Sequence, residues 1–207
     1  MSILSFDIGI KNLAFCQLSE NKEIEDWGII NISCDCICEH NNTKGNLCDK
    51  SATYITTWFD KQVKLCTGHS KLKQYIPPEK KKLKEYPDFL KCKEVIVENQ
   101  PSLKNPTMKS IQMLVYSYFL VNGLCDINSN ISNLEMINAR NKLKVYTGSP
   151  IECKYKESYK RNKFLAVKYC EIMIKDEKEH FIDLYNKSKK KDDLSDSYLQ
   201  GIYYINL

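Results

Sequence analysis

The feature that most constrains the fold is a single carboxylate inside an apolar segment at the start of the chain. Residues 4–18 read LSFDIGIKNLAFCQL, in which Asp7 interrupts a run that is otherwise typical of a buried strand, and a turn at Gly9–Asn12 follows. Burying an unpaired carboxylate costs several kcal/mol, so a cation is expected beside it. The segment therefore predicts a β-rich start with a cation site built into the sheet.

Length and composition describe a chain sized for one domain with room for a small insertion. It has 207 residues, of which 43% are hydrophobic and 28% are charged. No apolar run reaches the roughly 20 residues of a bilayer span, and Met1 leads into the first expected strand without a secretory leader. We therefore expect an intracellular protein with no membrane partner, whose 10 cysteines are reduced thiols or metal ligands.

The order of apolar segments predicts a mixed α/β fold. Three strands come first, a polar Cys-rich segment follows, and strand and helix patterns then alternate to the end of the chain. The expected strands are residues 3–9, 12–19, 23–32 and 93–100, with weaker candidates at 133–139 and 142–146; the expected helices are residues 107–121, 161–175 and 192–205. This order implies a mixed β-sheet with helices packed on it.

The polar segment at residues 33–70 carries a metal-ligand pattern that includes the Cys-x-x-His pair CTGH. Four ligands of this kind close a tetrahedral zinc site and hold a segment too small for its own core. The ligands we choose are Cys38, Cys48, Cys66 and His69, with Cys36 or Cys34 left open as the first ligand. We expect a structural zinc-binding insertion at 33–70, followed by a lysine-rich linker at 71–92.

Four carboxylates differ from those expected on a solvated surface. Asp7 lies in the first strand, Glu98 ends the strand VIVE, and Asp193 and Asp196 share one face at the start of the last helix. Favourable interaction with the helix dipole would also account for the last pair taken alone. Carboxylates can bind two Mg²⁺ ions roughly 3.5–4 Å apart, which clamp the attacking and leaving oxygens of a phosphodiester.

These motifs together resemble a known family. SFDIGIKNLAF, EDWGIINI, VIVENQPSLKNPTMKSIQMLVYSYF and KKDDLSDSYLQGIYY are similar to Holliday-junction resolvases of the RuvC type, most closely to the poxvirus-like branch of large DNA viruses. The resemblance covers residues 1–32 and 93–207 and implies an RNase H-like nuclease domain. It matches Asp7, Glu98, Asp193 and Asp196 to the four acids that bind two Mg²⁺ ions, for which Mn²⁺ can substitute.

The resemblance also implies an activity and an assembly. The expected enzyme is a crossover junction endodeoxyribonuclease that resolves four-way DNA junctions by paired nicks in DNA recombination and repair. It is expected to act as a homodimer, with the helix at 107–121 contributing to the interface. If the protein is viral, its expected location is the site of viral DNA replication in the infected cell.

Basic residues gather in blocks, which favours an anionic partner, although any one block also fits a solvated surface. Contacts to DNA phosphates would position a branched substrate without reading its sequence. Apart from one lysine in the first turn, the candidates follow the sheet or open a helix near the expected carboxylate site. They are Lys11, Arg140, Lys142, Lys160, Arg161 and Lys163.

Two other functions remain open. An RNase H-like nuclease acting on RNA–DNA hybrid would use the same four acids, and a non-catalytic zinc-containing DNA-binding protein would use the same fold. An actin-like ATPase also begins with an Asp-x-Gly strand, but it needs Gly-rich nucleotide loops and a second domain, and this chain has only 7 glycines.

Overall fold

The computed structural model describes residues 2–32, 37–41, 45–50, 52, 54–58, 61–66, 68–69, 72, 83, 86–103 and 105–207. The chain divides into two compact units. The first consists of Met1–Ile30 and Asp88–Leu207, and the second consists of Asn31–Pro87. None of the described helices is long and apolar enough to cross a membrane.

A five-stranded mixed sheet forms the centre of the first unit, with the strand order β3-β2-β1-β6-β7. Its strands are β1 (Ser2–Ile8), β2 (Asn12–Ser19), β3 (Ile24–Asn31), β6 (Glu94–Asn99) and β7 (Asn133–Asn138). The central strand β1 runs antiparallel to β2 and parallel to β6, which in turn runs parallel to β7. The carboxyl ends of β1, β6 and β7 therefore meet at the same edge of the sheet.

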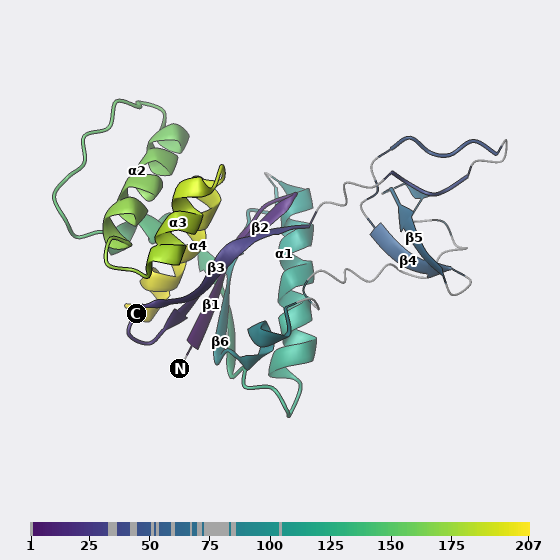
Figure 1. The fold of residues 1–207 in the computed structure, drawn as a ribbon, viewed down its shortest axis with the longest axis horizontal. Helices are drawn as coiled ribbons and strands as arrows, with labels where there is room; N and C mark the ends of the chain where they lie inside the picture. Colours follow the sequence, from purple (N-terminus) through teal and green to yellow (C-terminus); the bar gives the residue numbers. More distant parts are fainter. Residues whose placement is uncertain are drawn as a thin grey trace. The chain divides into compact units, whose positions relative to one another are not determined.

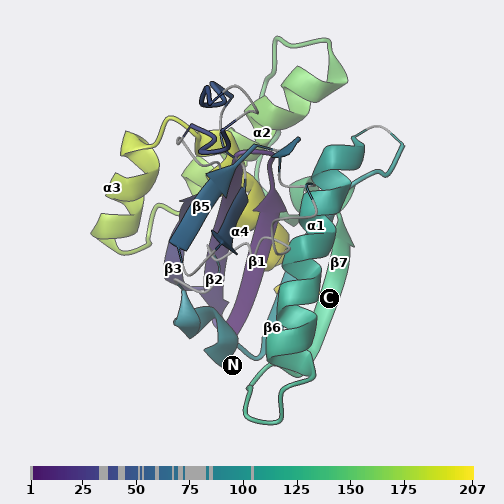
Figure 2. The ribbon, with the colours of Figure 1, turned by 90° about the vertical axis from the view of Figure 1, so that its right-hand side faces the viewer.

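Helices cover both faces of this sheet, as Figures 1 and 2 show. Helix α1 (Pro106–Phe119) packs on one face, and α4 (Lys191–Ile205) packs on β1 and β2 across the other. Helices α2 (Ser158–Met173) and α3 (Glu179–Lys187) contact α4. The mixed α/β architecture expected from the sequence is confirmed.

Each face of the sheet has its own apolar core. On the α1 face, Phe6 packs against the rings of Phe15, Phe89 and Phe119, with centroid separations of 6.5, 5.6 and 5.3 Å. Phe89 lies in the 3₁₀ helix η3 (Pro87–Lys91) and is buried. Residues 88–92, expected from the sequence to be linker, therefore belong to the first unit because Phe89 completes its core.

On the other face, the core under α4 is built around Trp27. Its indole ring stacks on Tyr185 of α3 with centroids 5.4 Å apart, and its Nε1 donates a 3.2 Å hydrogen bond to the carbonyl of Leu194. These two contacts hold the start of α4 against the sheet. The sequence pattern did not predict α3, whose apolar residues become recognisable as core only once they meet Trp27 and α4.

Side-chain caps explain why one predicted helix starts where expected and why one predicted strand is wrong. Helix α1 begins where expected because Asn105 caps it, its side chain accepting a 3.2 Å hydrogen bond from the Met108 amide, and Pro106 occupies the first turn. The weaker strand candidate at 142–146 is wrong. This segment lies in the 3₁₀ helix η5 (Ala139–Val145), since the Asn138 side chain caps the turn by accepting from the Arg140 amide at 3.0 Å.

The second unit contains a two-stranded antiparallel sheet, β4 (Tyr54–Trp58) with β5 (Lys61–Leu65), and a bridge between Asn41 and Leu47. Cys38, Leu65 and Cys66 form its small buried cluster. Cys34 and Cys36, the alternative first zinc ligands, lie outside the described residues, as does most of the expected linker at 71–92.

Candidate active site and metal centre

Asp7 and Glu98 end neighbouring parallel strands on the same face of the sheet. The β1–β6 register pairs Phe6 with Val97, so Asp7 and Glu98 follow side by side one residue further along. Side chains alternate between the faces along a strand, so Asp7 and Glu98 point away from the α1 face, where Phe6 and Val97 are buried. Sheet register alone therefore brings together two acids that are 91 positions apart in the sequence.

Asp196 reaches the same place from helix α4. One turn further along the helix, Gln200 donates hydrogen bonds to the Ser5 hydroxyl at 3.3 Å and to the Phe6 carbonyl at 3.2 Å. Because residues four apart share a helix face, this anchor turns Asp196 toward the end of β1. A side chain at Gly201 would come within 2.5 Å of Leu18, so glycine allows α4 to lie this close to the sheet.

The ammonium group of Lys142 lies among these three carboxylates. Its Nζ is 2.6 Å from Asp196 Oδ2, 3.2 Å from Glu98 Oε1 and 3.9 Å from Asp7 Oδ1. The side chains are 14% exposed for Asp7, 7% for Glu98, 18% for Asp196 and 13% for Lys142. The four residues therefore form a largely buried cluster, here called the carboxylate cluster, in which one positive charge faces three carboxylates.

Burial and neighbouring charges perturb the pKa values of Asp7, Asp196 and Lys142. Burial, followed by the charge of Glu98, raises the pKa of Asp7 well above its usual range, and Lys142 only partly opposes the shift. Burial likewise raises the pKa of Asp196 to about 6. Burial alone would lower the pKa of Lys142, but the three carboxylates outweigh it and the pKa is raised, so this lysine stays charged. The cluster thus has a deficit of positive charge that a divalent cation can fill.

A hydrogen-bond network behind Glu98 holds its carboxylate in place. The Gln100 side chain donates to Glu98 Oε2, and the Gln100 amide donates to Gln112 Oε1 of α1 at 2.8 Å. Lys109 donates to the same Gln112 oxygen at 3.1 Å and to the side chain of Asn99 at 3.0 Å. In the sequence ENQ, Gln100 therefore links Glu98 to helix α1 on the opposite face of the sheet.

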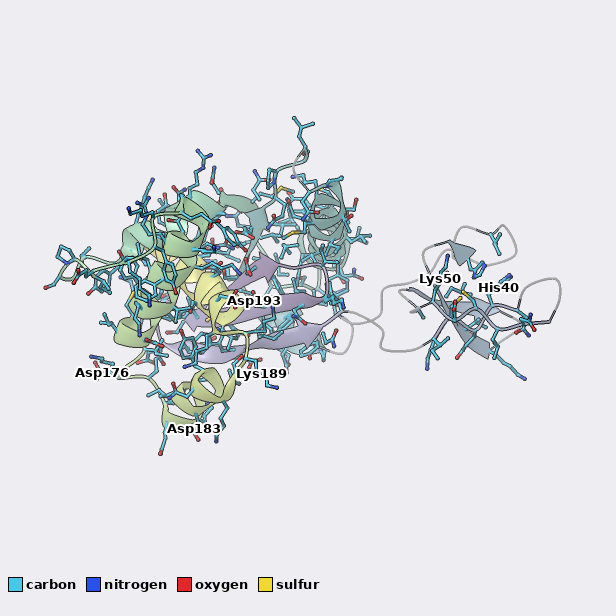
Figure 3. The ribbon with its side chains drawn as sticks, turned by 90° about the horizontal axis from the view of Figure 1, so that it is seen from above. His40, Lys50, Asp176, Asp183, Lys189 and Asp193 are labelled. Atoms are coloured by element: carbon cyan, nitrogen blue, oxygen red, sulfur yellow. The ribbon has the colours of Figure 1, made fainter. Side chains whose placement is uncertain are left out.

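Asp193, the fourth predicted acid, lies at the start of α4, as Figure 3 shows. Asp193 forms an ion pair with Lys190 at 3.7 Å, whereas the three acids of the carboxylate cluster pair with Lys142. Burial and the adjacent charge of Asp192 raise the pKa of Asp193. Asp192 itself pairs with Lys163 of α2. The structure thus joins Asp7, Glu98 and Asp196 directly and leaves Asp193 one helical turn away, on the same face of α4.

The predicted basic residues fall into two groups. Lys142 belongs to the carboxylate cluster, and Lys163 is tied to Asp192. The others lie on the surface: Lys11 in the turn after β1, Arg140 in η5, and Lys160 and Arg161 in the first turns of α2. The sequence did not reveal that Lys142 lies among the three acids. Its one indication of such a residue was that a buried carboxylate needs a cation beside it.

In the second unit the four residues predicted to bind zinc converge. The ligand atoms of Cys38, Cys48, Cys66 and His69 all lie within 4.8 Å of one another. Nδ1 of His69 is 3.3 Å from Sγ of Cys38 and 3.5 Å from Sγ of Cys66. Zinc–ligand bonds of about 2.3 Å to sulfur and 2.0 Å to nitrogen imply ligand separations of roughly 3.5–3.8 Å around a tetrahedron. This Cys₃His cluster fits a zinc site.

Backbone hydrogen bonds position these ligands. The Cys38 amide donates to the carbonyl of Lys50 at 2.8 Å, and the Cys48 amide donates to that of His40 at 3.0 Å; Figure 3 labels His40 and Lys50. Burial would raise the pKa of Cys66, but the amides of His69 and Gly68 donate to its sulfur and the pKa is lowered. The lowered pKa favours the thiolate of Cys66, which is the form that binds metal.

Comparison with known proteins places this fold. No protein-family model matches the chain. An uncharacterized protein of Acanthamoeba polyphaga mimivirus, L451, is 28% identical over an alignment that covers 99% of this chain and 74% of the relative. The crystal structure of Fowlpox virus resolvase with substrate Holliday junction DNA has a TM-score of 0.53 at 18% identity, covering 100% of this chain and 97% of that one.

A second solved structure, the yeast mitochondrial Holliday junction resolvase Ydc2, has a TM-score of 0.50 at 18% identity and covers 98% of this chain and 78% of the other. Both structures are similar over nearly the whole of this chain. The RNase H-like fold of the Holliday junction resolvases, which the sequence resemblance predicts, is confirmed.

The raised pKa of Asp196 predicts a pH-dependent stability for metal-free protein. The unfolded side chain loses its proton near its ordinary pKa of 3.8 and the folded one near 6, so ionisation favours the unfolded chain between these values. We expect the free energy of unfolding of the wild type, relative to Asp196→Asn, to fall by up to about 3 kcal/mol from pH 4 to 6 and then level off.

Urea unfolding in the presence of a chelator measures this difference. Asp183→Asn is the control, because that carboxylate is 58% exposed on α3 and should show no comparable trend. A difference between wild type and Asp196→Asn that stays constant across this pH range would contradict the description of the cluster.

Proposed function

We propose that this protein is a Mg²⁺-dependent, structure-specific endonuclease that resolves four-way DNA junctions. The observation that carries the proposal is the convergence of Asp7, Glu98 and Asp196 from three separate elements at one edge of a resolvase-like sheet. Clusters of carboxylate oxygens suit Mg²⁺. Their excess negative charge lowers the stability of the fold unless a cation is bound. Similarity to a mimivirus protein and to the Fowlpox virus enzyme supports action where the DNA of a large virus replicates.

Asp7, Glu98 and Asp196, with Asp193 on the adjoining turn of α4, are the residues that would hold the metal. Two bound Mg²⁺ ions, or Mn²⁺ in their place, would supply charge stabilisation and an activated water for in-line attack on phosphorus. The chain itself orients the acids through Gln100 and Gln200. Lys142 keeps the carboxylates together and presents a permanent positive charge where phosphate charge develops.

Branched DNA is the substrate we propose, because the surface around the cluster suits several phosphate strands at once. Lys11, Arg140, Lys160 and Arg161 are exposed, and they come from three different parts of the first unit. The Fowlpox virus resolvase, which shares this fold, has been crystallised with Holliday junction DNA. Phosphate contacts of this kind position a substrate by shape rather than by base sequence.

Removing one acid should stop cutting and preserve binding. Asp7→Asn and Glu98→Gln each remove a metal-ligand charge but keep the side-chain shape, so we expect Mg²⁺-dependent cleavage of a four-way junction to fall at least 100-fold. Junction affinity in gel-shift titrations should change by less than about threefold. Asp193→Asn should behave similarly. Asp183→Asn on α3 is the matched control and should cut normally.

The substrates in the same assay separate the competing functions. Four-way junction, linear duplex and RNA–DNA hybrid of matched sequence are incubated with wild-type protein and Mg²⁺. Preferential cutting of hybrid would make the protein an RNase H-like ribonuclease, and absence of cutting would favour a non-catalytic DNA-binding protein. Cleavage by Glu98→Gln at the wild-type rate would refute the two-metal site.

We also propose that the working unit is a two-fold homodimer, since one site nicks one strand and resolution requires paired nicks. Helix α1 buries Ile111, Val115 and Phe119 against the sheet. Its outer side and the following π-helical turn η4 (Leu120–Leu124) expose large apolar side chains: Met113 (40%), Leu114 (48%), Val121 (64%) and Leu124 (42%). This apolar surface is the interface we propose.

A charge placed on that surface should separate the protomers. We expect Leu114→Glu to be monomeric at micromolar concentration and to nick junctions without resolving them into two duplexes, whereas the wild type sediments as a dimer. Ile127→Glu, which alters an apolar side chain that is 97% exposed outside α1, should remain dimeric. Wild-type protein that is monomeric in sedimentation and still resolves junctions would contradict the proposal.

We propose further that the second unit is an insertion stabilised by structural zinc bound to Cys38, Cys48, Cys66 and His69. Among the described residues of this unit the buried cluster is small, so we attribute the folding free energy of residues 33–70 to the metal. Four protein ligands close a tetrahedral zinc, which leaves no position for substrate and excludes a catalytic role for this metal.

Metal analysis tests this assignment. Purified protein should retain about one zinc per chain after dialysis against Mg²⁺-free buffer, because thiolate sites bind zinc far more tightly than carboxylate sites bind Mg²⁺. Cys66→Ser should lose the zinc and make residues 33–70 sensitive to protease. Cys125→Ser, at an exposed cysteine outside the cluster, should keep it. Absence of zinc from wild-type protein grown in zinc-replete medium would refute the site.

A further inference from the structure

The start of helix α2 carries an exposed aromatic ring surrounded by basic side chains. Tyr159 is 64% exposed, and Lys163, one turn further along, places its Nζ 5.3 Å from the centre of the Tyr159 ring. Lys160 follows Tyr159 in the same turn, is 61% exposed and pairs with the nearby Glu157. Tyr159, Lys160 and Lys163 are here called the α2 platform.

An ion pair connects the platform to helix α4. Lys163 pairs with Asp192, which precedes Asp193 at the start of α4. Helices α2 and α4 lie beside each other in Figure 1, and their residues are in contact. A nucleotide held on the platform would therefore lie next to the acids at the start of α4.

The chemistry of the platform fits nucleic acid with an unstacked base. Every base has a flat face that stacks on an aromatic ring, and such stacking is sequence-tolerant when lysines hold the backbone phosphates. The bases of a continuous duplex are stacked on one another, so their faces are not accessible to Tyr159. A branch point interrupts this stacking, and nucleotides there can leave the helix at lower cost.

We propose that the α2 platform binds a nucleotide at the branch point, with its base stacked on Tyr159 and its adjoining phosphate on Lys160, while Lys163 links the ring to Asp192 of α4. This inference rests on the proposed junction-resolving function and deepens it, because it names a residue that distinguishes branched DNA from duplex. The carboxylate cluster with metal bound would cut any phosphodiester placed on it, whereas Tyr159 selects the DNA shape that is delivered to it.

Three substitutions at Tyr159 separate base stacking from a role of the hydroxyl group or of apolar bulk. Each is made in an Asp7→Asn background, so that DNA stays intact during titration, and binding is measured on a four-way junction and on duplex of the same sequence. Tyr159→Ala and Tyr159→Leu should weaken junction binding about tenfold, within the range of stacking on one base, and leave duplex binding within about twofold. Tyr159→Phe keeps the ring and should bind like the parent.

Charge controls accompany the ring variants. Lys160→Ala should weaken binding to both DNAs and reduce the salt dependence of binding by about one counterion. Lys187→Ala removes a comparable lysine from an intrahelical ion pair on α3 and should change binding to neither DNA. Thermal unfolding checks that the exposed positions leave the fold intact.

The outcomes distinguish this inference from the function on which it rests. A parent protein that binds junction and duplex equally would overturn both. A parent that prefers the junction, together with Tyr159→Ala that keeps the same preference, would overturn the platform and leave the resolvase proposal standing. Equal losses on junction and duplex, or Tyr159→Phe as weak as Tyr159→Ala, would also overturn it, because neither result is expected from stacking of a base on the ring.

Discussion

The arrangement of the first unit is set by the burial of three carboxylates around one lysine. Isolated, each buried acid would cost several kcal/mol, and their mutual repulsion would add to this cost. Lys142 offsets part of it through contacts of 2.6 and 3.2 Å to Asp196 and Glu98. Burial, together with the remaining excess of negative charge, raises the pKa values of Asp7 and Asp196. The same excess of negative charge favours the binding of a divalent cation at the cluster. The buried carboxylates thus lower the stability of the fold at the proposed catalytic site.

The rest of the unit holds this arrangement rigid from both faces of the sheet. Gln112 on α1 holds Gln100, which donates to Glu98, and Gln200 on α4 donates to the backbone of β1 and so turns Asp196 toward Asp7. The two aromatic cores, around Phe6 on one side and Trp27 on the other, fix both helices to the sheet. The acids therefore sit on regular elements rather than on loops, which suits a site that must hold metal ligands in defined positions.

The second unit uses a different means of stabilisation. Among its described residues the buried cluster is small, and we propose that zinc bound to the Cys₃His group provides the stability that a larger apolar core would otherwise supply. Soft thiolates select a tightly held metal, whereas hard carboxylates select one that exchanges. Ligand chemistry thus separates the proposed structural zinc site from the proposed catalytic site, and each can be altered without changing the ligands of the other.

The sequence by itself pointed to the three acids that converge in the first unit, to the cysteines and histidine that converge in the second, and to most elements. These depend on local pattern: an acid in an apolar strand, Cys and His at metal-ligand spacing, and periodicity. It could not determine the place of Lys142, which looks like any lysine in a basic segment and acquires its role when β7 and η5 carry it over the ends of β1 and β6. Nor could it show α3, the core position of Phe89 or the 3₁₀ turn at η5, since these arise from contacts with distant residues. Tertiary structure decided which charges share a buried site, because burial and distance, rather than residue type, set the energy of a charge.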